Sequence, residues 1–206
     1  MTGDTRNEII LFGKKEISAA FAGLIAVLVA IVLYHYVGPA AMIIIGGSGI
    51  LSWFVWLKTT YHFPVDPNRV LPLYMLLLAA ELLHMGEEFL TSFPDEFSKL
   101  TGAGMTQEIF VFWFVIVGTI LALLSMIGIM HHNPLSNYFL WFVIIGPGFV
   151  NGIAHFIFPV LAGTFYFPGL VTVLLPVAVG IYLAIRIYRD VKHQKTKSVG
   201  FGVQYE

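Results

Sequence analysis

Apolar runs long enough to cross a bilayer are the feature that most limits how this chain can fold. A helix of about 20 apolar residues spans roughly 30 Å of hydrocarbon. Six such runs lie between breaks rich in Gly, Pro or charge, at 17–36, 40–57, 70–90, 107–130, 137–161 and 166–188. Only 11% of the residues are charged, against about a quarter in soluble domains. The sequence therefore predicts an all-α polytopic membrane bundle of six transmembrane helices.

Glycine and proline predict local features within this bundle. The small-residue cluster Gly-Gly-Ser-Gly at 46–49 would let a neighbouring helix approach closely. Gly-Pro-Gly at 146–148 predicts a kink in the fifth helix. Residues 93–105, between the third and fourth runs, are predicted to form a loop.

The distribution of basic residues tests the number of crossings. Six crossings place both termini on one side, and ten of the eleven Lys and Arg residues then share that side, with Lys99 alone opposite. Because basic loops stay in the cytoplasm, we expect an integral protein of a plasma (inner) membrane with cytoplasmic termini. Residues 1–16 would be a cytoplasmic segment, 17–190 a single transmembrane domain and 191–206 a basic cytoplasmic tail.

Charge and cysteine content exclude several classes of function. The net charge of −1 gives no broad basic surface for nucleic acid, so membrane lipid is the expected partner. The chain has no cysteine. A covalently attached haem and an iron–sulfur cluster are therefore excluded.

Four ionisable side chains interrupt the end of the third apolar run: Glu81, His84, Glu87 and Glu88. A charge at bilayer depth costs about 2.5–3.5 kcal/mol on insertion scales, so such a group needs compensation. At about 100° per residue, Glu81 and Glu88 fall within roughly 60° of His84 on one side, and Glu87 about 60° away on the other. One helix face therefore presents an imidazole flanked by carboxylates.

The predicted topology brings further polar residues to the same depth. Glu108 begins the fourth run, Asn151 and His155 lie one turn apart in the fifth, and Tyr166 and Thr172 begin the sixth. At 1.5 Å per residue these positions fall within roughly 10 Å of one another in depth. We expect one polar site in the outer leaflet, built from four helices.

The motif His84-Met85-Gly86-Glu87-Glu88 resembles the one that defines a family of membrane proteins with an HXXEE motif. The likeness continues in Asn-Gly-Ile-Ala-His at 151–155 and in Tyr-Phe-Pro-Gly-Leu-Val-Thr at 166–172, and it covers about residues 70–190. Because the family is uncharacterised, the resemblance implies membership and a polar membrane site, and it implies no substrate.

His84, Glu88 and His155 are the predicted metal ligands. Imidazole with carboxylate suits zinc or iron, and a catalytic zinc keeps three protein ligands and an open position. Glu87 and Glu108 are the predicted acid/base residues. Glu108 could instead be a fourth ligand, and Glu87 could orient an imidazole.

Supporting roles are predicted for Glu81, Asn151, Tyr166 and Thr172. The Glu81-x-x-His84 spacing is found in di-iron bundles, but the chain has no second Glu-x-x-His. Metal-free acid/base chemistry and a purely structural cluster both stay open.

The leading functional hypothesis is a metal-dependent membrane enzyme, a hydrolase or lipid-modifying enzyme, that acts on a lipid or apolar small molecule. The alternatives are a small proton-coupled transporter that uses the carboxylates and histidines as a relay, and a non-catalytic scaffold. An enzyme needs a site that substrate can reach, a carrier needs a polar path to both faces, and a scaffold needs neither.

Overall fold

The computed structural model describes residues 4–200, with side chains described for residues 16–197. Most of the described chain is helical and this part contains no strand, which confirms the all-α prediction. The helices, with π-helical segments named η, are α1 (Asp4–Tyr36), α2 (Pro39–Ala41), η1 (Met42–Gly46), α3 (Gly47–Lys58), α4 (Pro67–Leu90), α5 (Phe93–Thr101), α6 (Gln107–Phe110), η2 (Val111–Val117), α7 (Gly118–Met130), α8 (Pro134–Ile145), η3 (Gly146–Asn151), α9 (Gly152–Ala162) and α10 (Leu174–Gly200).

Within the described residues, five helical stretches are long and apolar enough to span a membrane: Glu16–Tyr36, Pro39–Lys58, Pro67–Leu90, Gln107–Met130 and Pro134–Ala162. They correspond to the first five predicted runs and differ from them by at most three residues at either end. Large apolar side chains such as Leu24, Ile120 and Ile157 point outward from them and are exposed. These helices support a membrane protein with lipid-facing surfaces.

The sixth predicted run is folded differently from the expectation. The chain makes turns through 167–173, and α10 begins only at Leu174. Charged residues from Arg186 onward, among them Asp190, leave α10 outside the group of apolar spans. Helix α10 continues to Gly200, so the described part of the predicted tail is helical. Residues 201–206 lie outside the described residues.

The first apolar span begins at Glu16, close to the predicted boundary, but helix α1 extends further toward the N-terminus. Helix α1 begins at Asp4 and runs without interruption to Tyr36, so the expected polar segment continues directly into the first apolar span. No proline interrupts this stretch, and nothing else in the sequence forces the helix to start late. Residues 1–3 lie outside the described residues.

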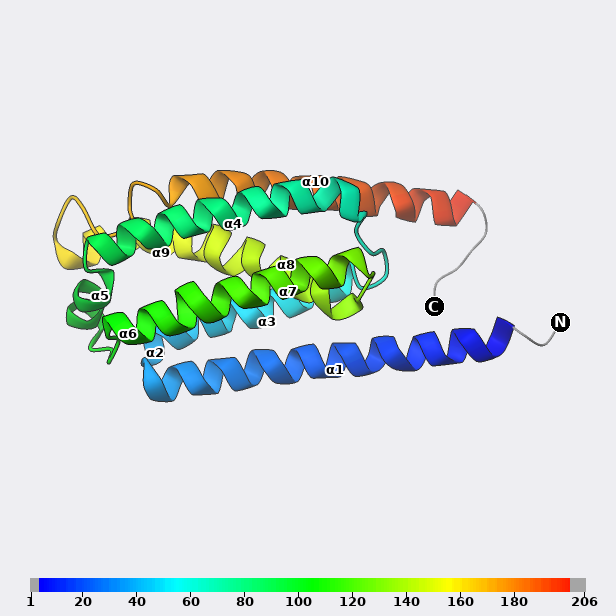
Figure 1. Ribbon diagram of the computed structural model, residues 1–206, viewed down its shortest axis with the longest axis horizontal. Coiled ribbons are helices and arrows are strands. Elements are labelled where there is room, and N and C mark those ends of the chain that lie inside the picture. The colour runs from blue at the N-terminus through cyan, green and yellow to red at the C-terminus, as the bar shows by residue number, and fades with distance from the viewer. Residues whose placement is uncertain (1–3, 201–206) are drawn as a thin grey trace.

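The helices form an elongated bundle in which α4 and α10 lie side by side (Figure 1). The start of α1 and the end of α10 lie at one end, and α5 and the turn after α9 lie at the other (Figure 1). At the first end, Arg69 of α4 pairs with Asp190 of α10 at 3.2 Å. A core that includes Tyr74, Leu140 and Leu183 joins α4, α8 and α10.

Residues 93–101 form helix α5, where a loop was predicted. Asp95 and Glu96 lie in its first turn and Lys99 in its last, which suits the helix dipole. Phe93 and Phe97, one turn apart, are buried and stacked with ring centroids 5.4 Å apart. Packing of these rings on the bundle, added to favourable end charges, explains why this short segment is helical.

The predicted close approach at the 46–49 cluster is confirmed at Gly46, which faces α1. A Cβ atom on Gly46 would lie 2.7 Å from Ala30 Cβ and 2.8 Å from Ala30 Cα. The adjacent Gly47 has nothing within 4 Å of the same position. Gly46 therefore sets how closely α1 and η1 pack.

We predict that Gly46→Ala destabilises the bundle, because the added methyl would force α1 away from η1. Overpacking of this kind costs about 1–3 kcal/mol. The matched control Gly47→Ala should be neutral or slightly stabilising, since alanine favours helix. Unfolding in detergent with a chemical denaturant measures both variants, and equal effects would contradict the packing described.

Candidate metal centre

Helix α4 carries the face on which the site is built. Asp66 caps its start by accepting a hydrogen bond from Asn68 N at 3.0 Å. From there the helix runs to Leu90, and Glu81, His84 and Glu88 are all buried on its inner face. The helical spacing of these three residues therefore gives the shared face that the sequence predicted.

His84, Glu88 and His155 meet in the interior of the bundle. Both histidines are 0% exposed and Glu88 is 4% exposed. Glu88 Oε1 lies 3.0 Å from His155 Nε2 and 3.4 Å from His84 Nε2. One potential ligand atom from each residue falls within 4.8 Å of the other two. The predicted metal ligands are thus brought together, from α4 and α9.

The two imidazole rings have different surroundings. They meet edge to face, with centroids 4.7 Å apart. His155 also packs against Phe93 and Phe158, and its Nδ1 has no hydrogen-bond partner among the described residues. Both nitrogens of His84, in contrast, have partners. Asn151 Nδ2 lies 3.0 Å from Nε2, and Thr172 Oγ1 lies 3.3 Å from Nδ1.

The Glu87 carboxylate accepts hydrogen bonds from the turn between α9 and α10. Its Oε1 accepts from the Tyr166 hydroxyl at 2.8 Å and from Val171 N at 3.4 Å. Its Oε2 accepts from Thr172 N at 2.7 Å and from Thr172 Oγ1 at 2.6 Å. Partial burial raises the pKa of Tyr166, and its hydrogen bond to Glu87 acts in the same direction. The phenol therefore stays a donor at neutral pH.

Gly169 closes this turn over the cluster. Its φ of +88° lies in the left-handed region that favours glycine. A Cβ atom there would lie 2.6 Å from His155 Cε1, 2.7 Å from His84 Cε1 and 2.8 Å from Glu88 Cγ. The backbone can approach all three candidate ligands this closely only because it carries no side chain.

Two predicted site residues lie outside this arrangement. Glu81 is 2% exposed and shares the inner face of α4, but its Oε1 has no hydrogen-bond partner among the described residues. Glu108 is exposed in the first turn of α6, where Thr106 caps the helix. No hydrogen bond or ion pair described for the cluster includes Glu108. Glu108 is therefore exposed and makes none of the contacts described for the cluster.

Some features of the site were not found from the sequence. Residues 166–172 were predicted to begin the sixth helix, whereas 168–173 form turns, and nothing indicated that Gly169 would pack on the ligands. Phe93 was assigned to a loop, yet its ring forms a wall beside His155, with centroids 5.4 Å apart. Both contacts join segments distant in sequence, and helical periodicity carries no signal for them.

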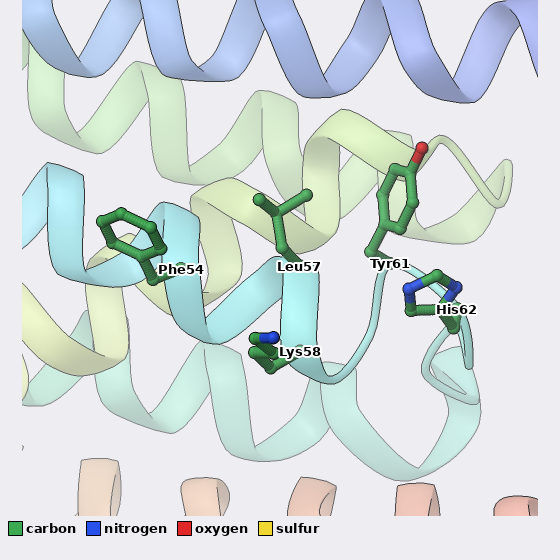
Figure 2. A pocket seen from close by; sticks show the side chains of 5 residues that line it. All are labelled: Phe54, Leu57, Lys58, Tyr61 and His62. Carbon is green, nitrogen blue, oxygen red and sulfur yellow. The ribbon is translucent and has the colours of Figure 1, made fainter.

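A separate hollow lies beside the end of α3 and the turn that follows it (Figure 2). Its lining residues are Phe54, Leu57, Lys58, Tyr61 and His62. None of them belongs to the His84 cluster, so this hollow does not form part of the candidate metal centre.

We predict that Gly169→Ala disrupts the centre. The added methyl would collide with His84, His155 and Glu88, and overpacking costs about 1–3 kcal/mol in addition to the roughly 1–2 kcal/mol of a left-handed non-glycine residue. Gly163→Ala is a matched control, because Gly163 has φ +66° and nothing within 4 Å of a Cβ. Unfolding free energies of the two variants isolate the collision, and equal losses would contradict it.

No family model, no curated protein and no solved structure matches this chain. The chemistry of the cluster itself therefore carries the functional interpretation.

Proposed function

We propose that this chain is a membrane-embedded, metal-dependent enzyme, with zinc or iron held by His84, Glu88 and His155. Its substrate is a lipid or another apolar small molecule, and the reaction is hydrolysis or another modification of that lipid. The observation that carries the proposal is the convergence of one potential ligand atom from each of these three side chains at one buried point.

The Asn151 amide supports this convergence. Its Nδ2 can only donate, so His84 Nε2, 3.0 Å away, accepts and carries a lone pair. Glu88 Oε1 lies 3.4 Å from the same nitrogen. Two acceptors then face each other with no proton between them in a buried site, which is unfavourable unless a cation lies between them.

The spacing of the cluster also suits a metal. In a tetrahedral zinc site with bonds of about 2.1 Å, neighbouring ligand atoms lie roughly 3.4 Å apart. Glu88 Oε1 lies 3.4 Å from His84 Nε2 and 3.0 Å from His155 Nε2. Two imidazoles and a carboxylate form a common ligand set for catalytic zinc, which would polarise a bound carbonyl or activate water.

The surroundings favour an apolar substrate. An aromatic cluster lies next to the centre and contains Phe93, Phe97, Phe110, Phe158 and Phe167. The exposed apolar faces of the spanning helices would bring lipid to this end of the bundle. Rings beside the ligands exclude water and would accept acyl chains, which fits a reaction on a molecule dissolved in the bilayer.

The proposal includes a membrane orientation. If α10 makes a sixth crossing, both termini lie in the cytoplasm and the centre lies in the outer leaflet of a plasma membrane. The basic residues of α10, such as Arg189 and Lys192, support this orientation. Membership in the HXXEE-motif family belongs to the same proposal and rests on the motif at 84–88.

Glu81 favours a second candidate function, a proton-coupled carrier. Its buried carboxyl has an oxygen with no hydrogen-bond partner among the described residues, and it lies two turns below Glu88 on the same face of α4. A row of buried carboxyls is typical of intramembrane proton relays. The paired acceptors around His84 still favour the metal centre.

We predict near-stoichiometric zinc or iron in protein purified in detergent without chelators. His84→Ala, His155→Ala and Glu88→Gln should each lower the metal content at least tenfold, because each removes one ligand. His131→Ala is the control, since His131 is exposed and caps the C-terminal end of α7. Elemental analysis gives the result, and a metal-free wild type or unchanged variants would overturn the metal centre.

The enzymatic part of the proposal has its own test. Purified protein reconstituted with a total membrane lipid extract should convert at least one lipid class, as followed by mass spectrometry. Glu88→Gln should abolish the conversion, while His131→Ala should leave it intact. Bound metal without any lipid conversion would argue against the enzyme and leave a metal site of another function.

A further inference from the structure

We infer that Thr172 and Glu87 fix the tautomer of His84, which makes Glu87 a positioning residue that acts through Thr172. The inference rests on the proposed function in one respect, that His84 Nε2 is the metal-binding atom. It assigns Glu87 a role other than the predicted proton transfer.

The first step concerns the Thr172 hydroxyl. Thr172 Oγ1 donates its proton to Glu87 Oε2 over 2.6 Å. The same oxygen lies 3.3 Å from His84 Nδ1. Since a hydroxyl has a single proton, Oγ1 can only accept from the ring, and Nδ1 must carry the hydrogen. The relay therefore runs from His84 Nδ1–H through Thr172 Oγ1–H to the Glu87 carboxylate.

The contact at His84 Nε2 indicates the same tautomer independently. The Asn151 amide donates to His84 Nε2 over 3.0 Å, so that nitrogen carries the lone pair. Asn151 ends η3, whereas Thr172 lies in the turn before α10. Two separate segments thus select the tautomer that leaves Nε2 without a hydrogen, and a metal bound at this nitrogen would take the place of the Asn151 amide.

The position of Thr172 is itself fixed by Glu87. The carboxylate accepts from the backbone N of Thr172 at 2.7 Å as well as from its hydroxyl, and it also holds Tyr166 and Val171. Glu87 and His84 lie three residues apart on α4, so the relay closes over a single helical turn. With four donors on its two oxygens, Glu87 is placed to orient the ring and is poorly placed to collect a substrate proton.

Metal-binding histidines commonly donate their second nitrogen to a carboxylate, and loss of that partner lowers metal affinity 10–100-fold. Here a hydroxyl lies between the ring and the carboxylate. His155 has no such partner on Nδ1 among the described residues. The centre therefore combines one histidine whose Nδ1 is held by a hydroxyl and one whose Nδ1 has no partner among the described residues.

The direct test is ¹⁵N NMR of histidine-labelled, metal-free protein in detergent, with the His84 signals assigned by their loss in His84→Ala. Wild type and Thr172→Ser should show His84 with hydrogen on Nδ1. Thr172→Val, which keeps the shape and removes the hydroxyl, should shift His84 toward the other tautomer, and Glu87→Gln should do so in part. A wild-type His84 with hydrogen on Nε2, or no change in Thr172→Val, would overturn the inference.

The same variants are then titrated with zinc alone. Thr172→Val should bind zinc 10–100-fold more weakly than wild type, and Thr172→Ser should restore most of the affinity. Thr59→Val is the matched control, because the Thr59 hydroxyl contacts only Val55 O, at 2.6 Å, among the hydrogen bonds described for it. Equal losses in Thr59→Val and Thr172→Val would refute a specific effect. If wild type binds no zinc, the zinc form of the proposed function fails, while the NMR result still decides the tautomer.

Discussion

The Glu88 carboxylate is a charge-bearing group held between apolar helices, and the surrounding structure compensates for it. Removing a carboxylate from water costs several kcal/mol unless good partners replace the hydration. Glu88 obtains the His155 imidazole of α9 at 3.0 Å, while His84 Nε2 of its own helix lies 3.4 Å away as a second acceptor. Because His155 lies 67 residues further along the chain than Glu88, these contacts fix α9 against α4. The polar cluster therefore aligns helices whose outer surfaces face lipid and offer little directional preference.

The turn after α9 packs on the candidate ligands that α4 presents. Gly169 lets the backbone lie directly on the three candidate ligands, and Glu87 holds the same turn through Tyr166, Val171 and Thr172. The two acidic residues of the motif thus have different contacts. Glu88 faces the centre, and Glu87 faces the segment that covers it. Adjacent carboxylates can differ in this way because successive residues on a helix point about 100° apart.

Much of this organisation could be predicted from the sequence, for identifiable reasons. Apolar length identified five spans, and the 3.6-residue period placed Glu81, His84 and Glu88 on one face. The Gly-Pro-Gly prediction at 146–148 corresponds to the π-helical segment η3. Helix α5, the late start of α10 and the exposure of Glu108 were not predicted. Each of these depends on which distant segment packs against it, and local periodicity holds no information on that choice.

The number of residues in segment η3 determines whether the site can form. A π-helical turn accommodates an extra residue within an otherwise α-helical path. Asn151 ends this segment, and His155 follows one turn later. Loss of one residue from 146–150 would rotate both side chains by about 100° about the helix axis relative to α8, turning them away from His84 and Glu88. Related sequences could therefore change residue types in this segment more readily than they could change its length, and a conserved spacing between Pro147 and His155 would identify the same centre where the surrounding residues have diverged.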